Sequence, residues 1–159
     1  MNIFVLDRDP AVAARSLCDK HVSKMVLETA QIMSTVVRQR GVDDDALYRP
    51  THQRHPCTVW AGETSDNFLW LALHGLAMSE EYTYRYGRRH KSQDVIERAA
   101  THIGVFPSMG QTPHPMAMPD SYKGPCPVQA YRDYYHGEKQ YMASWKTRPA
   151  PQWWEVSNG

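Results

Sequence analysis

The sequence predicts a single compact domain over residues 1–159 that is mainly α-helical, with one short N-terminal β-strand and a long proline-rich loop. Three observations predict this fold class. Apolar residues recur at helical spacing through several long segments. The alternation of strands and helices that a parallel sheet requires does not occur. The chain, with 42% hydrophobic residues, is long enough for one core and too short for two ordinary domains.

The N-terminal two thirds of the chain are predicted to hold the strand and most of the helices. Residues 2–7 (NIFVLD) form the β-prone run, and Asp9 followed by Pro10 is typical of a helix start. A longer helix is expected over residues 19–40, where Gly41 ends it. Three further helices are expected in CTVWAGE after Pro56, in TSDNFLWLALHGLAMSEEYTYRYG (64–87) and in KSQDVIERAATHIG (91–104).

The C-terminal third is predicted to combine a loop, a helix and a tail. Residues 105–127 contain six of the eleven prolines and should form a long ordered loop across the surface. Residues 128–148 are expected to form the last long helix. The tail, 149–159, carries two tryptophans that we expect to dock back onto the domain.

Composition and charge exclude several classes of protein. The net charge of +1 excludes a strongly polybasic protein. No apolar run approaches the roughly 18 residues that span a bilayer, and MNIFVLDRDP lacks the features of a signal peptide, so we expect a cytoplasmic protein without a membrane partner. Cys18, Cys57 and Cys126 form no CxxC pair, and no two histidines have metal-ligand spacing, so no metal ligands are assigned.

Polar side chains form a stripe along the predicted helix 19–40. His21, Lys24, Glu28 and Gln31 fall within an arc of roughly 80° at about 100° per residue. The stripe offers a base, a cation, a carboxylate and an amide. A simple surface pair between Lys24 and Glu28, four residues apart, would explain the same pattern.

A second polar stripe occurs on the predicted helix 64–87. Asn67, His74, Glu81 and Arg85 fall within an arc of roughly 40°. If the two helices pack edge to edge, both stripes line one cleft suited to an anionic substrate; otherwise each stripe faces outward on its own. His55 would be a pocket wall or part of the core.

Basic residues interleaved with aromatics suggest DNA binding. YRYGRRHK (84–91) is densely basic, and Lys and Arg outnumber acids between Lys123 and Arg148. A solvated basic face with aromatics in the core is the alternative. The candidate DNA-binding residues are Arg88, Arg89, Lys91, Lys123, Arg132, Tyr135 and Lys139.

Five stretches resemble, in order and over nearly the whole chain, a family of small phage-encoded proteins. They are FVLDRDPAVAARSLCDKHVSKMVLETAQ, RHPCTVWAGETSDNFLWL, EYTYRYGRRHK, MAMPDxYK and YRDYYHGEKQYMASWKTRPAPQWW. The family is similar to the predicted amino acid:DNA transferases of thymidine hypermodification, and some members carry labels linking them to pyrimidine-dimer glycosylases. The resemblance implies transfer of an amino acid, such as glycine, onto pyrophosphorylated 5-hydroxymethyluracil in phage DNA, with displacement of pyrophosphate.

The resemblance also implies partners, location and residue roles. Phage DNA and a free amino acid would be the partners, and the host cytoplasm the location during infection. No cofactor would be required, although Mg²⁺ would suit a pyrophosphate leaving group. His21, Lys24 and Glu28 would be catalytic. The residues that would bind the substrate are Gln31, His55, Asn67, His74, Glu81, Arg85 and Asp120.

Two alternatives to the transferase stay open at this point. The first is a DNA glycosylase or lyase, in which Lys24 or another amine attacks the sugar C1′ and forms a Schiff base that borohydride traps. The second is a DNA-binding module without enzymatic activity.

Overall fold

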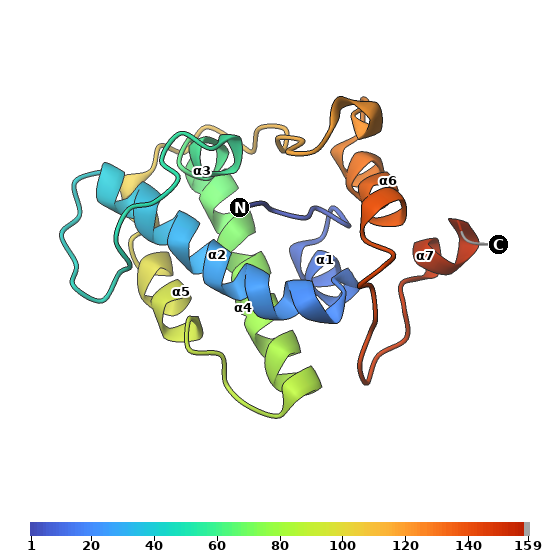
Figure 1. Ribbon diagram of the computed structural model, residues 1–159. Helices are drawn as coiled ribbons and strands as arrows, with labels where there is room; N and C mark the ends of the chain where they lie inside the picture. The colour runs from blue at the N-terminus through green and yellow to red at the C-terminus, as the bar shows by residue number, and fades with distance from the viewer. Residues whose placement is uncertain (158–159) are drawn as a thin grey trace.

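Helices α2 (Asp19–Gln39) and α4 (Ser65–Tyr86) cross at the centre of the molecule in the computed structural model, which describes residues 1–157 (Figure 1). Helix α2 also packs against α3 (Pro56–Ala61) and α5 (Gln93–Ala100), and α1 (Pro10–Ser16) packs against α4. The prediction of a mainly helical, compact fold is confirmed. None of the described helices is both long and apolar enough to cross a bilayer.

Local sequence signals set the ends and the close packing of α4. The Thr64 side chain accepts a hydrogen bond from the Asn67 amide at 3.0 Å, which caps the first turn. Gly87 ends the helix in the left-handed conformation with φ +72°, which glycine adopts without strain. A Cβ atom on Gly75 would lie 2.9 Å from Thr29 of α2, so glycine at this position lets the two helices approach closely.

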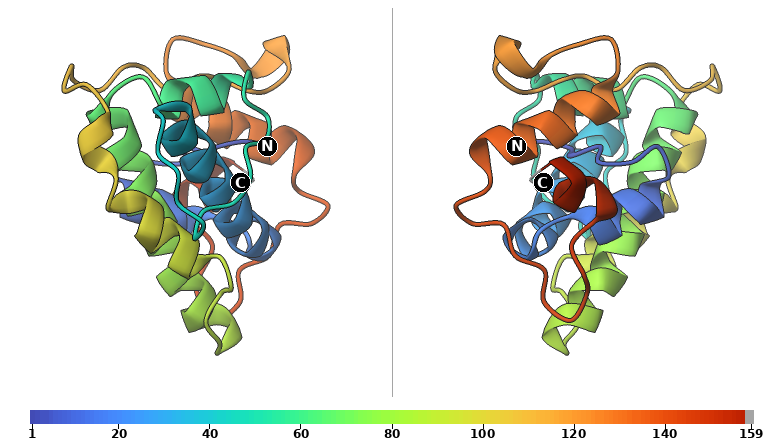
Figure 2. Two further views of the ribbon diagram at one scale, coloured as in Figure 1. Left: turned by 90° about the vertical axis from the view of Figure 1, so that its left-hand side faces the viewer. Right: turned by 90° about the vertical axis from the view of Figure 1, so that its right-hand side faces the viewer.

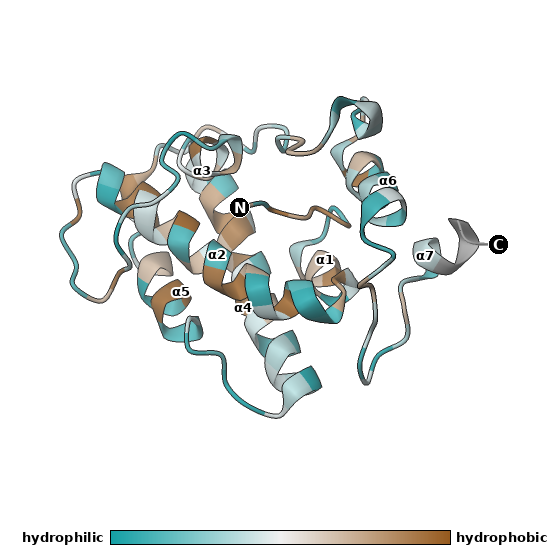
Figure 3. Ribbon diagram, in the orientation of Figure 1, coloured by the Kyte–Doolittle hydropathy of each residue, from teal (hydrophilic) through white to brown (hydrophobic). Residues whose placement is uncertain are grey.

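The predicted N-terminal strand is wrong, since the structure has no strand within residues 1–157. Ile3 to Leu6 are buried, and Figure 3 shows this segment as an apolar stretch outside any helix. Its backbone is bonded by side chains instead of by a second strand: the Ile3 amide donates to Asn2 Oδ1, and Arg132 Nε donates to the Leu6 carbonyl. The β-prone composition therefore reflects burial and not pairing.

The segment 105–127 runs along the surface from the short 3₁₀ turn η1 (Ile103–Val105) and contains a second such turn, η2 (Asp120–Tyr122). Buried side chains hold it at several points. Asn67 Oδ1 accepts a hydrogen bond from the Thr112 amide at 2.9 Å, and the Ala117 amide donates to the Tyr131 hydroxyl at 3.1 Å.

The last predicted helix, 128–148, is wrong in its second half. Helix α6 spans Pro127–Glu138, and residues 139–148 form a non-helical strap. Tertiary contacts replace the helical ones along the strap: the Ser144 carbonyl and the Lys146 amide both bond to Asp19. Helix α7 (Gln152–Ser157) follows and lies beside α6, as the right-hand view of Figure 2 shows. Residues 158–159 of the predicted docking tail lie outside the described residues.

Candidate functional site

A pocket of about 360 Å³ opens beside the N-terminal half of α2. Segments far apart in the sequence build its wall: the first residues of the chain, α2, the residue that caps α3, the segment 105–127, and the C-terminal part of α6 with the residue that follows it. The lining residues are Met1, Asn2, Phe4, His21, Lys24, Met25, Glu28, His55, Ala117, Tyr134 and Lys139.

The α-amino group of Met1 and the carboxylate of Glu28 meet in this pocket. The Met1 nitrogen lies 2.9 Å from Glu28 Oε1, and only 9% of the Glu28 side chain is exposed. The second carboxylate oxygen, Oε2, is buried and has no hydrogen-bond partner among the described residues. Lys24 Nζ lies 3.9 Å from Oε2, too far for a hydrogen bond. The buried Oε2 atom is therefore left without a hydrogen bond among the described residues, with the Lys24 ammonium as a nearby charged group.

The amine is held in place through the two N-terminal side chains. The Met1 side chain is 1% exposed, and its sulfur accepts a weak hydrogen bond from Thr58 Oγ1 at 3.6 Å. Asn2 donates to the Ala117 carbonyl at 2.9 Å and accepts from the Tyr131 hydroxyl at 2.8 Å. Since Met1 as a whole is half-buried while its side chain is not exposed, its exposure comes from main-chain atoms. The amine is thus held in place by residues of the pocket wall, of which Met1 is itself a part.

His21 forms one wall of the pocket as a neutral ring. It stacks on Phe4 with ring centroids 4.2 Å apart, and its Nδ1 is hydrogen-bonded to the Tyr135 hydroxyl at 2.6 Å. Burial lowers the pKa of His21 to about 3, and the nearby charges of Lys139 and Lys24 act in the same direction. Tyr135, a candidate DNA-binding residue, is fully buried here and supports His21 from below the surface.

Cations surround the mouth of the pocket. The Lys24 side chain is 69% exposed, and Lys139 Nζ lies 4.8 Å above the Tyr134 ring. The pKa of His55 is lowered by burial, then by the N-terminal ammonium group and His52, against a smaller opposing effect of Glu28. The pocket lining therefore carries three cationic groups, namely Lys24, Lys139 and the Met1 amine, and one carboxylate, that of Glu28.

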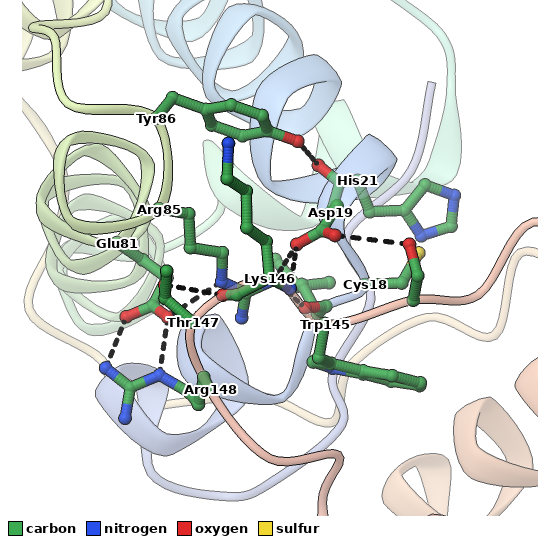
Figure 4. Close-up of polar contacts among 12 residues, drawn as sticks. Cys18, Asp19, His21, Glu81, Arg85, Tyr86, Trp145, Lys146, Thr147 and Arg148 are labelled. Atoms are coloured by element: carbon green, nitrogen blue, oxygen red, sulfur yellow. Dashed lines mark hydrogen bonds and ion pairs between the residues drawn. The ribbon is translucent and has the colours of Figure 1, made fainter.

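The second predicted stripe does not share this pocket. Glu81 and Arg85 are buried and paired with each other at 2.9 Å. Figure 4 shows Arg85 also bound to Asp19, and Arg148 of the strap bound to both oxygens of Glu81. This cluster attaches the strap to α2 and α4. The second stripe therefore neither shares one cleft with the first nor faces outward on its own, the two alternatives that the sequence left open.

Asn67 and His74 also have partners within the core. Asn67 donates to the Trp60 carbonyl and to Thr112 Oγ1, both at 2.8 Å. His74 Nδ1 is hydrogen-bonded to the Pro10 carbonyl at 2.9 Å, and burial lowers its pKa to about 4. These contacts join α4 to α1, α3 and the segment 105–127.

The remaining candidate residues lie outside the pocket lining. Gln31 is half-buried, one turn beyond Glu28 on α2. Asp120 is exposed and pairs with Lys123 at 2.9 Å, while Arg132 pairs with Asp7 at 3.4 Å. Three further cations lie in the turn between α4 and α5. Arg88 donates a hydrogen bond to the Tyr82 hydroxyl, and Arg89 pairs with Asp94 and Glu97. Lys91 is exposed.

The reading of side-chain patterns missed the amine of Met1, Asn2 and Tyr134 as parts of the pocket. A backbone amine leaves no trace in hydrophobic periodicity. One feature of the sequence did point to the N-terminus. The apolar segment after Asn2 had no second predicted strand to pair with, so it had to pack against other parts of the fold. The described residues contain no group of three or more His, Cys, Asp or Glu side chains placed to hold a metal ion.

Comparison with known proteins gives a match to a protein family. A family model described as "Pyrimidine dimer DNA glycosylase" matches residues 1–94, which include Met1, His21, Lys24, Glu28 and His55. No curated protein matches the chain, and no solved structure does.

This match corrects the transferase reading. The matching family is a DNA glycosylase family and not a family of amino acid:DNA transferases of thymidine hypermodification, so the implied transferase reaction and its amino acid partner are wrong. Both kinds of enzyme require cations for phosphates, a carboxylate or imidazole and aromatic surfaces, and the side-chain inventory therefore could not separate them. The glycosylase alternative fits the match.

Proposed function

The chain belongs to the pyrimidine dimer DNA glycosylase family, and on this premise we propose that it excises damaged pyrimidines from DNA, with the α-amine of Met1 as nucleophile. The observation that carries the proposal is the contact of 2.9 Å between this amine and Glu28 inside a pocket. An amine that attacks the sugar C1′ forms a covalent intermediate and replaces one difficult step by two easier ones.

The Met1 amine suits this role better than Lys24. An amine must lose its proton before it attacks, and the Glu28 carboxylate beside the Met1 amine is placed to accept that proton. The Lys24 ammonium is largely in solvent, whereas the amine of Met1 is held against a buried carboxylate. Lys24 therefore acts as a cation for a DNA phosphate.

The reaction follows from these positions. The amine nitrogen forms a bond to C1′, the bond from C1′ to the pyrimidine nitrogen breaks, and the departing base takes up the electron pair and a proton. Glu28 accepts the proton that the attacking amine releases and stabilises the positive charge that develops at C1′. Opening of the sugar ring then leaves an imine between the Met1 nitrogen and C1′.

Cations around the pocket suit the phosphates on either side of the target nucleotide. Lys24 and Lys139 line the pocket, Lys20 lies one turn before Lys24 on the exposed side of α2, and Arg54 precedes His55 in the chain. Each phosphate that such residues neutralise adds to the salt dependence of binding. The aromatic ring of Tyr134 and the neutral ring of His21 offer surfaces for a base that has left the stack.

The test is borohydride trapping on a duplex with one cyclobutane pyrimidine dimer, with the undamaged duplex as control. We expect the wild-type protein to form a covalent complex with the damaged duplex alone, and peptide mapping to find the reduced sugar on the N-terminal nitrogen. Extra residues placed before Met1 should abolish trapping. Glu28→Gln should lower the rate by about 100- to 10,000-fold.

The matched control is Lys24→Ala, which should retain trapping and bind DNA more weakly. If Lys24→Ala abolished the complex while the N-terminally extended protein retained it, Lys24 would be the nucleophile. If the folded wild-type protein neither trapped nor excised the dimer, the catalytic proposal would be wrong and DNA binding alone would remain.

A further inference from the structure

A fully buried hydroxyl, that of Tyr135, contacts the pocket histidine His21. The hydroxyl oxygen lies 2.6 Å from His21 Nδ1, and no part of the Tyr135 residue is exposed. The backbone amide of Cys18 donates a hydrogen bond to the same oxygen at 3.4 Å, and the Cys18 sulfur lies 3.7 Å from it. The Tyr135 hydroxyl therefore has three polar neighbours, one of which belongs to the pocket wall.

The single proton of the Tyr135 hydroxyl can be donated to only one of these neighbours. The Cys18 amide is itself a donor, so the acceptor is either His21 Nδ1 or the sulfur. Sulfur is a weak acceptor at a long distance here, whereas the contact with Nδ1 is short. Burial raises the pKa of Tyr135 well above its ordinary value, so the hydroxyl keeps this proton. Nδ1 of His21 is therefore the acceptor.

This hydrogen bond determines which nitrogen of His21 carries the proton. A neutral imidazole that accepts at Nδ1 is protonated at Nε2. His21 is neutral near pH 7, because burial and the charges of Lys139 and Lys24 lower its pKa to about 3. In the part of the chain that the structure describes, only Tyr135 is hydrogen-bonded to the ring, and the ring lines the pocket. The Nε2–H group is thus left for a molecule bound in the pocket.

We propose that Tyr135 is a positioning residue, which fixes His21 as a neutral hydrogen-bond donor to the ring oxygen, O4′, of the sugar under attack. The inference rests on the proposed glycosylase function. When the imine forms, the bond between C1′ and O4′ breaks and its electron pair goes to O4′. This oxygen takes up the proton that Glu28 received from the amine. An N–H group already aimed at O4′ stabilises the negative charge that develops there.

The tautomer is measured on the wild-type protein with ¹⁵N in its histidine rings. The ¹⁵N chemical shift distinguishes a nitrogen that carries a proton from one that does not, and a spectrum of His21→Gln identifies the His21 signals by their absence. We expect the proton on Nε2 at neutral pH. A proton on Nδ1 would overturn the proposal, because Nε2 would then be an acceptor.

Borohydride trapping rates on the damaged duplex test the effect on the reaction. Tyr135→Phe should lower the rate by about tenfold, because the ring of His21 is no longer held by a hydrogen bond. The matched control is Tyr86→Phe, which removes a hydroxyl that donates to the Asp19 carbonyl of α2 at 3.1 Å, and it should leave the rate unchanged.

Variants of His21 separate a donor from a group that transfers a proton. His21→Ala should lower the rate by about 100-fold, the usual effect of losing one such donor. His21→Gln should retain most of the rate, because its amide donates a hydrogen bond without ionising. In the His21→Gln background, Tyr135→Phe should cause little further loss, since the two residues act as one unit.

Two kinetic results would also contradict the proposal: equal rates for Tyr135→Phe and Tyr86→Phe, or equally low rates for His21→Gln and His21→Ala. If Tyr135→Phe failed to fold, the wild-type spectrum and the two His21 variants would still decide. If the wild-type protein formed no covalent complex while Nε2 carried the proton, the proposed function would be wrong and the positioning of His21 by Tyr135 would stand.

Discussion

The position of the Met1 amine depends on a small number of side-chain hydrogen bonds, chiefly those of Asn2 and Tyr131. The nitrogen of the Asn2 side-chain amide donates a hydrogen bond to the Ala117 carbonyl, and its oxygen accepts one from the Tyr131 hydroxyl. The same hydroxyl also donates toward the Pro115 carbonyl at 3.1 Å and accepts from the Ala117 amide. The position of the nucleophile therefore depends on a tyrosine 130 positions later in the chain.

Tyr131→Phe tests this dependence. It keeps the ring in the core, where Phe4 contacts its edge, and removes only the hydroxyl. We expect a loss of about 1–3 kcal/mol in the free energy of unfolding, because buried polar groups lose their partner. Trapping should slow while DNA affinity is retained. Urea denaturation and trapping rates are the measurements, with Tyr141→Phe, exposed by 82%, as the control. Unchanged trapping would show that the amine is held without Tyr131.

The sequence alone identified three of the residues that line the pocket from α2. His21, Lys24 and Glu28 were grouped by helical geometry, and the structure places all three on the pocket wall. The roles given to them remain predictions. Asn67, His74, Glu81 and Arg85 showed an equally regular pattern, yet their side chains bind other segments of the core. Periodicity predicts which residues share one face of a helix, but not whether that face contacts a pocket or other segments of the core.

At the scale of elements, the long helices were predicted, whereas the irregular backbone of segments 2–7 and 139–148 was not. Helices α2 and α4 have strong periodicity and clear terminal residues, so their limits follow from local rules. The segment 2–7 and the strap 139–148 are set by distant partners, such as Arg132 for Leu6 and Asp19 for Ser144. No local pattern contains that information.

The attachment of the strap gives a prediction at this scale. Arg148 Nε and Nη2 lie 2.6 and 3.0 Å from the two oxygens of the buried Glu81 carboxylate. Arg148→Ala should loosen the strap, because a charge-assisted pair with a buried group is lost. We expect faster chymotrypsin cleavage after Tyr141. Arg89→Ala is the control, since Arg89 also pairs with two carboxylates but in solvent, where such pairs contribute little. Equal cleavage of both variants would contradict the prediction.

The whole molecule encloses several histidines in the neutral form. Burial is the main cause that lowers the pKa of His21 to about 3 and the pKa values of His74 and His114 to about 4. In the unfolded chain each would titrate near its ordinary value of 6.5. The unfolded state therefore binds more protons below that value, and the stability that these groups contribute is present above it and lost as the pH falls.

Acid lability is the resulting prediction for the whole molecule. Between pH 6 and pH 4, each of these histidines should lower the free energy of unfolding by about 1.4 kcal/mol per pH unit. Urea denaturation at pH 7, 6 and 5 measures the slope. His74→Asn, which retains a donor for the Pro10 carbonyl, should reduce the slope by the contribution of one proton. A stability that stays constant from pH 7 to pH 5 would contradict this interpretation.

The hydrogen bond between Tyr131 and Asn2 joins residues 129 positions apart, and this separation has a consequence for biosynthesis. The contact that fixes Asn2 cannot form until Tyr131 has been synthesised. At 5–20 residues per second the α-amine stays exposed for roughly 6 to 26 s after its own synthesis. During that interval, enzymes that trim or acylate nascent N-termini compete with folding for the same nitrogen. The fraction of active protein therefore depends on the rate of folding relative to the rate of N-terminal processing during translation.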